Sequence, residues 1–279
     1  MSRFHLFVVD IDGTLVNSRN ALTAAAREAI AKAMDAGVRV VLATGRRYGR
    51  ALPLVQPLRL DVPVITASGA LIKLPGSHRT LFRARLERPL LCQVLRIIED
   101  HGYDALLYSD TFEQGFEFFR PPNDMPEPLL AEFLSLNEGW WRDWPELMVE
   151  PPEDIFACFA MGTQSDMSRV HEDLQQRLPE QLYTHVLRSP RYKGYMCEIA
   201  PAGVTKWSGV RYLAQQWGIA DKEICAVGDD VNDLPMIEAA GLGIAMANAL
   251  PQVQEAADHV VPSCDEDGIV EAVRLILAS

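Results

Sequence analysis

The chain has 279 residues, of which 48% are hydrophobic, enough to bury the core of one large domain or two moderate ones. A formal net charge of −12 argues against binding to nucleic acid, which needs a basic face. The five cysteines form no C-x-x-C pair and no stretch approaches the roughly 20 apolar residues of a membrane span, so we expect a cytoplasmic protein with reduced thiols.

Apolar runs alternate with helical patterns through the first third of the chain. Phe4–Val9 is typical of a short buried strand, and Thr23–Ala36 carries apolar residues at helical spacing, closed by Gly37. Val38–Ala43 and Val62–Thr66 are two further strand-like runs. Strands that are apolar throughout and alternate with a helix predict a parallel sheet covered on both faces.

The last third of the chain returns to the same pattern. Helices are predicted over Ala202–Gln216 and Gly268–Leu277. Strands are predicted at Ile224–Val227, Leu242–Met246 and His259–Val261. Because the two ends of the chain share one pattern, they are expected to form a single α/β core of Rossmann-like type.

The middle of the chain, from about residue 86 to residue 190, is richer in proline, tryptophan and glutamate. Its segments RPPNDMPEP and WWRDWPELMVEPPED are predicted to be loops or connectors. The helices and strands predicted between them are Pro89–Asp100, Ser165–Arg177, Tyr103–Ser109, Ile155–Met161 and Tyr183–Leu187. We therefore predict an α+β module, residues 86–190, inserted into a discontinuous core of residues 1–85 and 191–279.

Two carboxylates stand where the first strand ends, in the segment VVDIDGTLV. Asp10 and Asp12 flank one apolar residue, and side chains two apart in an extended chain point the same way. Ligands of open α/β sheets bind at the carboxyl ends of the strands, so both acids are expected to face one pocket. The alternative, a pair of helix-capping or solvated acids, explains the preceding apolar strand less well.

Two weaker signals lie at Thr44-Gly45-Arg46 and at Lys206. A hydroxyl, a backbone N–H and a glycine that permits close approach could hold a phosphate oxygen, although Thr-Gly also makes ordinary turns. Arg46 is equally consistent with a structural ion pair and with a ligand contact. Lys206 opens a predicted helix, where it opposes the helix dipole unless it meets an anion. A plain surface lysine is the alternative.

The segment ICAVGDDVNDLPM places several oxygen-bearing side chains in one loop, namely Asp229, Asp230, Asn232 and Asp233. Carboxylates this close repel one another unless a cation or hydrogen bonds offset their charge. Oxygen ligands of this kind suit Mg²⁺. One acid can cap the helix that follows at Leu234–Ala240, but three are too many for that purpose.

Taken together, these motifs resemble those of the haloacid dehalogenase-like superfamily. The match comprises DIDGTL, ATGR, the isolated Lys206 and GDDVNDLPM, in order, and the C-terminal GLGIAMANAL and ADHVVPSCDEDGI are similar to its Cof-type phosphatases. The resemblance implies a Rossmann-like core whose inserted module is a type IIB cap that sets substrate specificity. One departure is Ser68-Gly69-Ala70, where this family often has Asn-Gly-Ala.

The resemblance implies a role for each motif residue. Asp10 would be the nucleophile that forms an aspartyl-phosphate, and Asp12 the general acid and base. The Mg²⁺ ligands and supports would be Asp10, the backbone carbonyl of Asp12, Asp229 and Asp233. The phosphoryl oxygens would be held by Thr44, Gly45, Lys206 and Asn232. Asp230 is interpreted as structural.

The implied function is a Mg²⁺-dependent phosphatase acting on small phosphorylated metabolites, sugar phosphates first. The alternatives are a phosphomutase on the same scaffold and, less well supported, a non-catalytic metabolite-binding protein. Partners would be the metabolite and, at most, a second copy of the chain, with neither nucleic acid nor membrane. Candidate substrate contacts are Trp140, Trp141 and Trp144, which fit the hydrophobic core of the module at least as well. Tyr108, Arg120, His185 and Tyr192 are further candidates, and the sequence gives no reason to choose among them.

Overall fold

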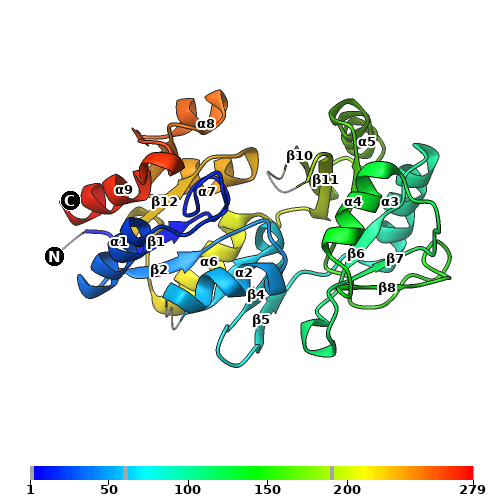
Figure 1. Ribbon diagram of the computed structural model, residues 1–279, viewed down its shortest axis with the longest axis horizontal. Helices are drawn as coiled ribbons and strands as arrows, with labels where there is room; N and C mark the ends of the chain where they lie inside the picture. The colour runs from blue at the N-terminus through cyan, green and yellow to red at the C-terminus, as the bar shows by residue number, and fades with distance from the viewer. Residues whose placement is uncertain (1–2, 59–61, 189–191, 279) are drawn as a thin grey trace. The chain divides into compact units, whose positions relative to one another are not determined.

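The computed structural model describes residues 3–58, 62–188 and 192–278 (Figure 1). The chain divides into two compact units. The first unit comprises Met1–Phe82 and Thr205–Ser279, and the second comprises Arg83–Val204. The sequence placed the return to the first unit at residue 191, which lies outside the described residues. The structure places it later, at Thr205.

A five-stranded parallel sheet forms the centre of the first unit, with the strand order β14-β13-β12-β1-β2. The predicted parallel sheet is thus confirmed. β1 lies in the middle, paired with β12 on one side and β2 on the other. The strands are β1 Leu6–Val9, β2 Arg39–Leu42, β12 Ile224–Gly228, β13 Leu242–Met246 and β14 His259–Val261.

Both faces of this sheet are buried. Leu6 and Val8 pack into one apolar cluster with Val210 and Met236, whereas Phe7 and Val9 alternate to the opposite face and are equally inaccessible. The strands read as unbroken apolar runs because neither face meets water. The helices of the unit are α1 Ala24–Asp35, α2 Tyr48–Val55, α6 Lys206–Trp217, α7 Leu234–Ala239, α8 Pro251–Ala256 and α9 Gly268–Leu277.

A small second sheet continues the edge of the central one. Its order is β3-β4-β5, with β3 Val64–Thr66, β4 Leu71–Lys73 and β5 Thr80–Arg83. An isolated parallel bridge between Ala43 and Ile65 links it to the end of β2. The sharp turn between β3 and β4 therefore lies beside the residues that follow β2.

The second unit is built on a six-stranded sheet, ordered β10-β11-β9-β6-β7-β8, in which only the described pair β7–β8 is parallel. Its strands are β6 Leu106–Tyr108, β7 Phe118–Arg120, β8 Trp141–Asp143, β9 Ala157–Gly162, β10 Leu182–Leu187 and β11 Tyr195–Pro201. Its helices are α3 Arg88–Asp100, α4 Pro128–Leu136 and α5 Gln164–Arg177.

Two parts of the second unit differ from the sequence prediction. The segment WWRDWPELMVEPPED, expected to be a connector, contains β8, and α4 begins at Pro128, the last residue of the other such segment. The residues after 191, assigned to the core by their sequence, contain β11, which pairs with β9 and β10 and so belongs to this sheet. Among the described residues, none of the helices is long and apolar enough to cross a membrane.

Candidate active site

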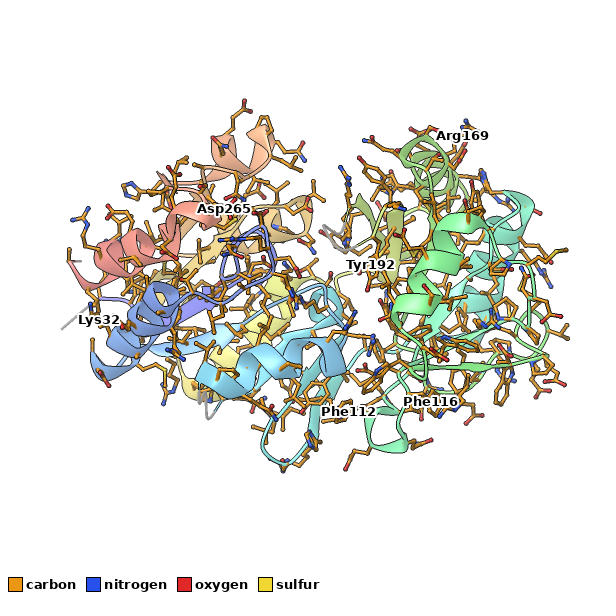
Figure 2. All side chains as sticks on the ribbon, viewed as in Figure 1. Lys32, Phe112, Phe116, Arg169, Tyr192 and Asp265 are labelled. Carbon is orange, nitrogen blue, oxygen red and sulfur yellow. The ribbon has the colours of Figure 1, made fainter. Side chains whose placement is uncertain are left out.

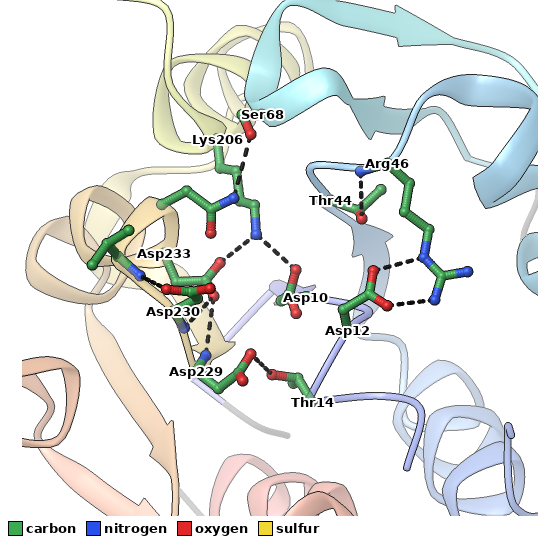
Figure 3. A network of polar contacts seen from close by, with 12 residues as sticks. Asp10, Asp12, Thr14, Thr44, Arg46, Ser68, Lys206, Asp229, Asp230 and Asp233 are labelled. Atoms are coloured by element: carbon green, nitrogen blue, oxygen red, sulfur yellow. Dashed lines mark hydrogen bonds and ion pairs between the residues drawn. The ribbon is translucent and has the colours of Figure 1, made fainter. Parts of the chain in front are cut away.

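Three neighbouring strands of the central sheet end in polar residues at the same edge. Asp10 directly follows β1, Thr44 lies two residues beyond β2, and Asp229 directly follows β12. Because these strands are parallel and adjacent, their carboxyl ends converge, as the sequence predicted. All of the residues labelled in Figure 3 belong to the first unit.

Lys206 lies at the centre of this group and binds two carboxylates (Figure 3). Its Nζ is 2.7 Å from Asp10 Oδ1 and 2.6 Å from Asp233 Oδ1. The lysine is only 1% exposed, and the two acids are 3% and 0% exposed. The pKa of Lys206 is raised because the attraction of the two carboxylates outweighs the desolvation of its ammonium. The anion that the sequence predicted for this lysine is therefore present within the protein.

The start of α6 explains how a lysine reaches the interior. Thr205 caps the helix through a reciprocal bond pair with Ser208, which fixes Lys206 as the first helical residue. Gly69, with φ of +102°, passes so close that a Cβ there would lie 2.0 Å from the Thr205 carbonyl oxygen. Only glycine permits this approach, so the β3–β4 turn and the start of α6 pack directly together.

Asp233 organises the acid-rich loop from inside. Its Oδ2 accepts hydrogen bonds from the backbone N–H groups of Asp229 and Asp230, at 3.0 and 3.1 Å, while its Oδ1 binds Lys206. Asp230 caps the short 3₁₀ helix Val231–Asp233 by accepting from the Val231 N–H. This contact agrees with the interpretation of Asp230 as structural. Asp233, in contrast, has a hydrogen-bond donor at each of its carboxylate oxygens.

Three carboxylates could together hold a metal ion. Oxygen atoms of Asp10, Asp229 and Asp233 all lie within 4.8 Å of one another. Burial, followed by the charge of neighbouring carboxylates, raises the pKa of Asp10 to about 8 despite Lys206, and burial raises the pKa of Asp229 as well. One lysine does not neutralise the negative charge of three carboxylates. The site therefore offers oxygen ligands and uncompensated negative charge, which suit a hard divalent cation.

Asp12 lies beside this group but is held differently. Its carboxylate forms a two-pronged ion pair with Arg46, with Nε–Oδ2 and Nη2–Oδ1 distances of 2.6 Å. The Asp12 side chain is 28% exposed, whereas Arg46 is 7% exposed. The sequence left Arg46 open between ion pair and ligand contact, and the structure shows the ion pair. A planar guanidinium fixes both oxygens of a carboxylate at once.

Thr44 presents its hydroxyl but not its backbone N–H. The N–H donates to the Ile65 carbonyl at 2.9 Å, so the prediction that it is available to a phosphate is wrong. The reason is the parallel bridge that continues β2 toward β3, which uses this donor. The hydroxyl oxygen accepts from the Arg46 N–H at 3.1 Å and keeps its own proton for a ligand. Gly45 follows at the same strand end.

Asn232 and Ser68 are joined by a side-chain hydrogen bond. The Asn232 Nδ2 donates to the Ser68 Oγ over 3.3 Å, and both residues are buried. Ser68 adopts a left-handed backbone conformation, with φ of 52°, at the position where the family often has asparagine. Asparagine favours that conformation more than serine does. Of the predicted site residues, the structure brings Asp10, Lys206, Asp229 and Asp233 together, whereas Asp12 pairs with Arg46 and lies outside the group of three acids.

Two contacting residues escaped the sequence-based prediction. Thr14 donates from its Oγ1 to Asp229 Oδ1 at 3.2 Å, and Asn248, in the turn after β13, reaches the same carboxylate. Gly13, with φ of +76°, lies so close to Asp229 that a Cβ there would be 2.1 Å from its Oδ2. The signal for Thr14 was its place two residues after Asp12, and the signal for Asn248 was its place in the family-like segment GLGIAMANAL.

Comparison with known proteins places the chain in a family. The sequence profile of the haloacid dehalogenase-like hydrolases matches residues 7–273. The chain is 32% identical to YxeH of Bacillus subtilis, covering 99% of both proteins, and 29% identical to 5-amino-6-(5-phospho-D-ribitylamino)uracil phosphatase YwtE of the same organism, covering 97% of both.

Solved structures agree with this assignment. A haloacid dehalogenase-like hydrolase from Bacteroides thetaiotaomicron superposes with a TM-score of 0.79 and 27% identity, covering 98% of this chain and 99% of that one. The predicted fold class, a parallel α/β core with an additional sheet-containing region, is confirmed by this match. With the family profile spanning nearly all of its length, the chain belongs to the haloacid dehalogenase-like hydrolases.

Proposed function

We propose that this protein is a Mg²⁺-dependent phosphomonoesterase that hydrolyses small phosphorylated metabolites, sugar phosphates first, through an aspartyl-phosphate. The observation that carries this proposal is the buried Asp10, bound to Lys206 and adjacent to two further carboxylates. Phosphatase activity is supported by the family and by phosphatase-named relatives such as YwtE. Beyond phosphatase activity, we propose the substrate class, the metal and the covalent intermediate.

Asp10 is the proposed nucleophile because one of its oxygens is fixed and the other is left to react. Lys206 binds Oδ1, so Oδ2 is the atom that would attack phosphorus. The P–Oδ2 bond forms as the bond from phosphorus to the ester oxygen breaks. Water then attacks the same phosphorus, releasing inorganic phosphate and regenerating the carboxylate, which divides one difficult displacement into two.

Asp12 is the proposed acid and base for these two steps. In the first step a proton passes from its carboxyl group to the departing ester oxygen, and in the second step its carboxylate takes a proton from the attacking water. Arg46 holds both of its oxygens and so fixes the direction of the group.

A bound Mg²⁺ would supply positive charge to the transferring phosphoryl group. Asp10, the backbone carbonyl of Asp12 and Asp229 would hold it, and Asp233 would fix the loop that carries Asp229. The Thr44 hydroxyl, the Asn232 amide and Lys206 would donate to the phosphoryl oxygens, with Gly45 allowing close approach. Positioning and charge neutralisation of this kind are what phosphoryl transfer mainly requires.

Specificity for the rest of the substrate is assigned to the second unit, residues 83–204. The name of YwtE describes a phosphorylated ribitylamino-uracil substrate for that relative. This supports a small phosphorylated metabolite with a polyol or ring as the substrate class here. The net charge of −12 is unfavourable for nucleic acid, and the protein is proposed to act as a monomer or homodimer.

The test is a screen of phosphorylated metabolites for phosphate release with Mg²⁺, followed by turnover of the best hexose phosphate in ¹⁸O-labelled water. Labelled inorganic phosphate and free sugar, lost on addition of chelator, are the expected products. An isomeric sugar phosphate without solvent oxygen would show a phosphomutase instead. Binding of metabolites without any product would show the non-catalytic alternative.

A further inference from the structure

Asn248 links three segments of the first unit through one side-chain amide. Its Nδ2 donates to the Gly13 carbonyl oxygen over 2.9 Å and lies 3.4 Å from Asp229 Oδ2, while its Oδ1 accepts from the Cys264 N–H over 2.8 Å. These partners fix the orientation of the amide, because a carbonyl needs a donor and an N–H needs an acceptor. Asn248 is exposed, so its contacts do not serve to fill the core.

The Asp229 carboxylate has a separate donor for each oxygen. Thr14 Oγ1 donates to Oδ1 over 3.2 Å, and Asn248 Nδ2 faces Oδ2. The backbone of Asp229 is held as well, because its carbonyl oxygen accepts from the Leu250 N–H at 3.1 Å. The direction of this carboxylate is therefore set by Thr14 and by the turn that carries Asn248.

The same amide also fixes the chain next to the nucleophile. Gly13 directly follows Asp12, whose backbone carbonyl is a proposed metal ligand, and the hydrogen bond at the Gly13 oxygen holds the following peptide in place. Asn248 thus contacts both sides of the proposed metal site, the first loop through Gly13 and the acid-rich loop through Asp229. Such outer contacts orient ligands and typically change metal affinity by about 10- to 100-fold when they are removed.

We propose that Asn248 is a positioning residue for Mg²⁺ binding, an inference that rests on the proposed function. It sets the direction of the Asp229 carboxylate and the peptide after Asp12, and it does not bind the metal itself. The simpler alternative is that Asn248 only stabilises the turn Ala247–Ala249.

Gln254 provides a matched control for that alternative. Its side-chain amide donates to the carbonyl oxygens of Ala247 and Ala249, at 3.1 and 2.9 Å, and therefore supports the same turn from α8. Its described contacts include neither Gly13 nor Asp229. Replacing Gln254 removes support for the turn, whereas replacing Asn248 also removes the contacts to Asp229, a proposed metal ligand, and to Gly13, which follows the Asp12 ligand.

The experiment measures Mg²⁺ binding by calorimetry for the wild-type protein, Asn248→Ala, Asn248→Leu and Gln254→Ala. The dissociation constant is expected to rise about tenfold in both Asn248 variants and to stay within twofold in Gln254→Ala. With p-nitrophenyl phosphate, the half-saturating Mg²⁺ concentration should rise in parallel, while KM for the ester at saturating Mg²⁺ changes less than twofold. Thermal unfolding without metal reports the effect on the fold.

Four outcomes would overturn the inference. Unchanged affinity in both Asn248 variants would remove the positioning role and leave the proposed function standing. An equal loss in Gln254→Ala would assign the effect to the turn. Loss of the folded state in both Asn248 variants would show a structural role. Failure of the wild-type protein to bind Mg²⁺ would contradict the metal assignment and the inference together.

Discussion

The two units differ in how their buried groups are arranged, although the second unit also buries the carboxylates of Glu117 and Glu198 and the first also buries the rings of Phe4, Phe7 and Tyr48. The first unit buries charge: Asp10, Lys206 and Asp233 are at most 3% exposed and are bonded to one another. The second unit buries aromatic rings, and Phe118, Phe133 and Phe159 contact one another with ring centroids 5.3–6.4 Å apart. Buried charges cost stability, so the cluster of Lys206 with Asp10 and Asp233 in the first unit indicates chemistry, whereas the three rings contribute to the packing of the second.

This difference bears on the aromatic residues considered as substrate contacts. Trp144 packs edge-on against Phe119 and donates from its indole to the Glu150 carbonyl oxygen, and Trp140 stacks on Phe112. Figure 2 shows Phe112 and Phe116 among the side chains of the second unit. The contacts of Trp140 and Trp144 support the packing alternative for these two tryptophans over a role as a stacking surface for a ligand.

The largest difference in activity between a substitution in the first unit and one in the second is expected for Asp10→Asn. Removing the nucleophile should lower phosphate release by at least about 10⁴-fold, because removal of a catalytic nucleophile has effects of that order. The fold should persist, since the substitution keeps the side-chain volume. Asp143→Asn, which removes an exposed acid paired with Arg120 in the second unit, is the control and should retain activity. Residual activity near the wild-type level in Asp10→Asn would contradict covalent catalysis.

Lys206→Met should lower both activity and stability. The methionine leaves Asp10 and Asp233 buried without their cation, which typically costs about 3–5 kcal/mol of unfolding free energy. Urea denaturation measures the loss. Lys222→Met, at an exposed lysine of the same unit, should change stability by less than about 0.5 kcal/mol. Equal stability of the two variants would show that the buried ion pairs contribute little.

Arg46→Ala should impair the acid and base step selectively. Without the guanidinium, Asp12 loses its fixed direction, and we expect kcat to fall about tenfold for alkyl phosphates. The fall should be smaller for p-nitrophenyl phosphate, whose leaving group needs little protonation. Arg19→Ala, at an exposed arginine of the same unit, is the control. Equal losses with both esters would argue that Arg46 acts on something other than Asp12.

The smallest effect is expected at His171 in the second unit. Partial burial, with a contribution from His185, lowers the pKa of His171, whose Nδ1 is 2.8 Å from Thr184 Oγ1. The unfolded chain then binds more protons, so the stability from neutral His171 is present above pH 6.5 and is lost as the pH falls below that value. His171→Gln should reduce the fall in Tm between pH 7.5 and 5.5 by about 1–2 °C.

The control for the pH experiment is His259→Gln, at an exposed histidine of the first unit. This variant should show the wild-type pH dependence. If His259→Gln and His171→Gln altered the dependence equally, partial burial of His171 would not be its cause.

The positions of residues at the ends of parallel strands were predictable from sequence. Contacts that depend on where a long side chain or a backbone N–H finds its partner were not. Asp10 and Asp229 follow strands that pair in parallel, so apolar runs alone predicted their convergence. The ion pair of Arg46 with Asp12 depends on where a long side chain lies, and the use of the Thr44 N–H depends on a bridge to Ile65. Neither leaves a local pattern.

Secondary structure was least predictable where the same residue type is common in two kinds of structure. Pro128 was interpreted as part of a connector, yet proline is also favoured in the first turn of a helix, and Glu127 caps α4. β11 was not predicted as a strand, and its residues were assigned to the core. Its antiparallel pairing with β9 and β10 decides the matter, and pairing partners are not encoded locally.

The central place of β1 has a consequence for how the protein is made. Leu6 pairs with Ile224, so about 200 residues must be synthesised before the first strand meets one of its two partners. At roughly 5–20 residues per second, this takes on the order of 10–40 s on the ribosome. The second unit is continuous and is complete earlier. The nascent chain therefore carries an apolar strand that awaits its partner, and the proposed active site can form only after Asp229 and Asp233 have been synthesised.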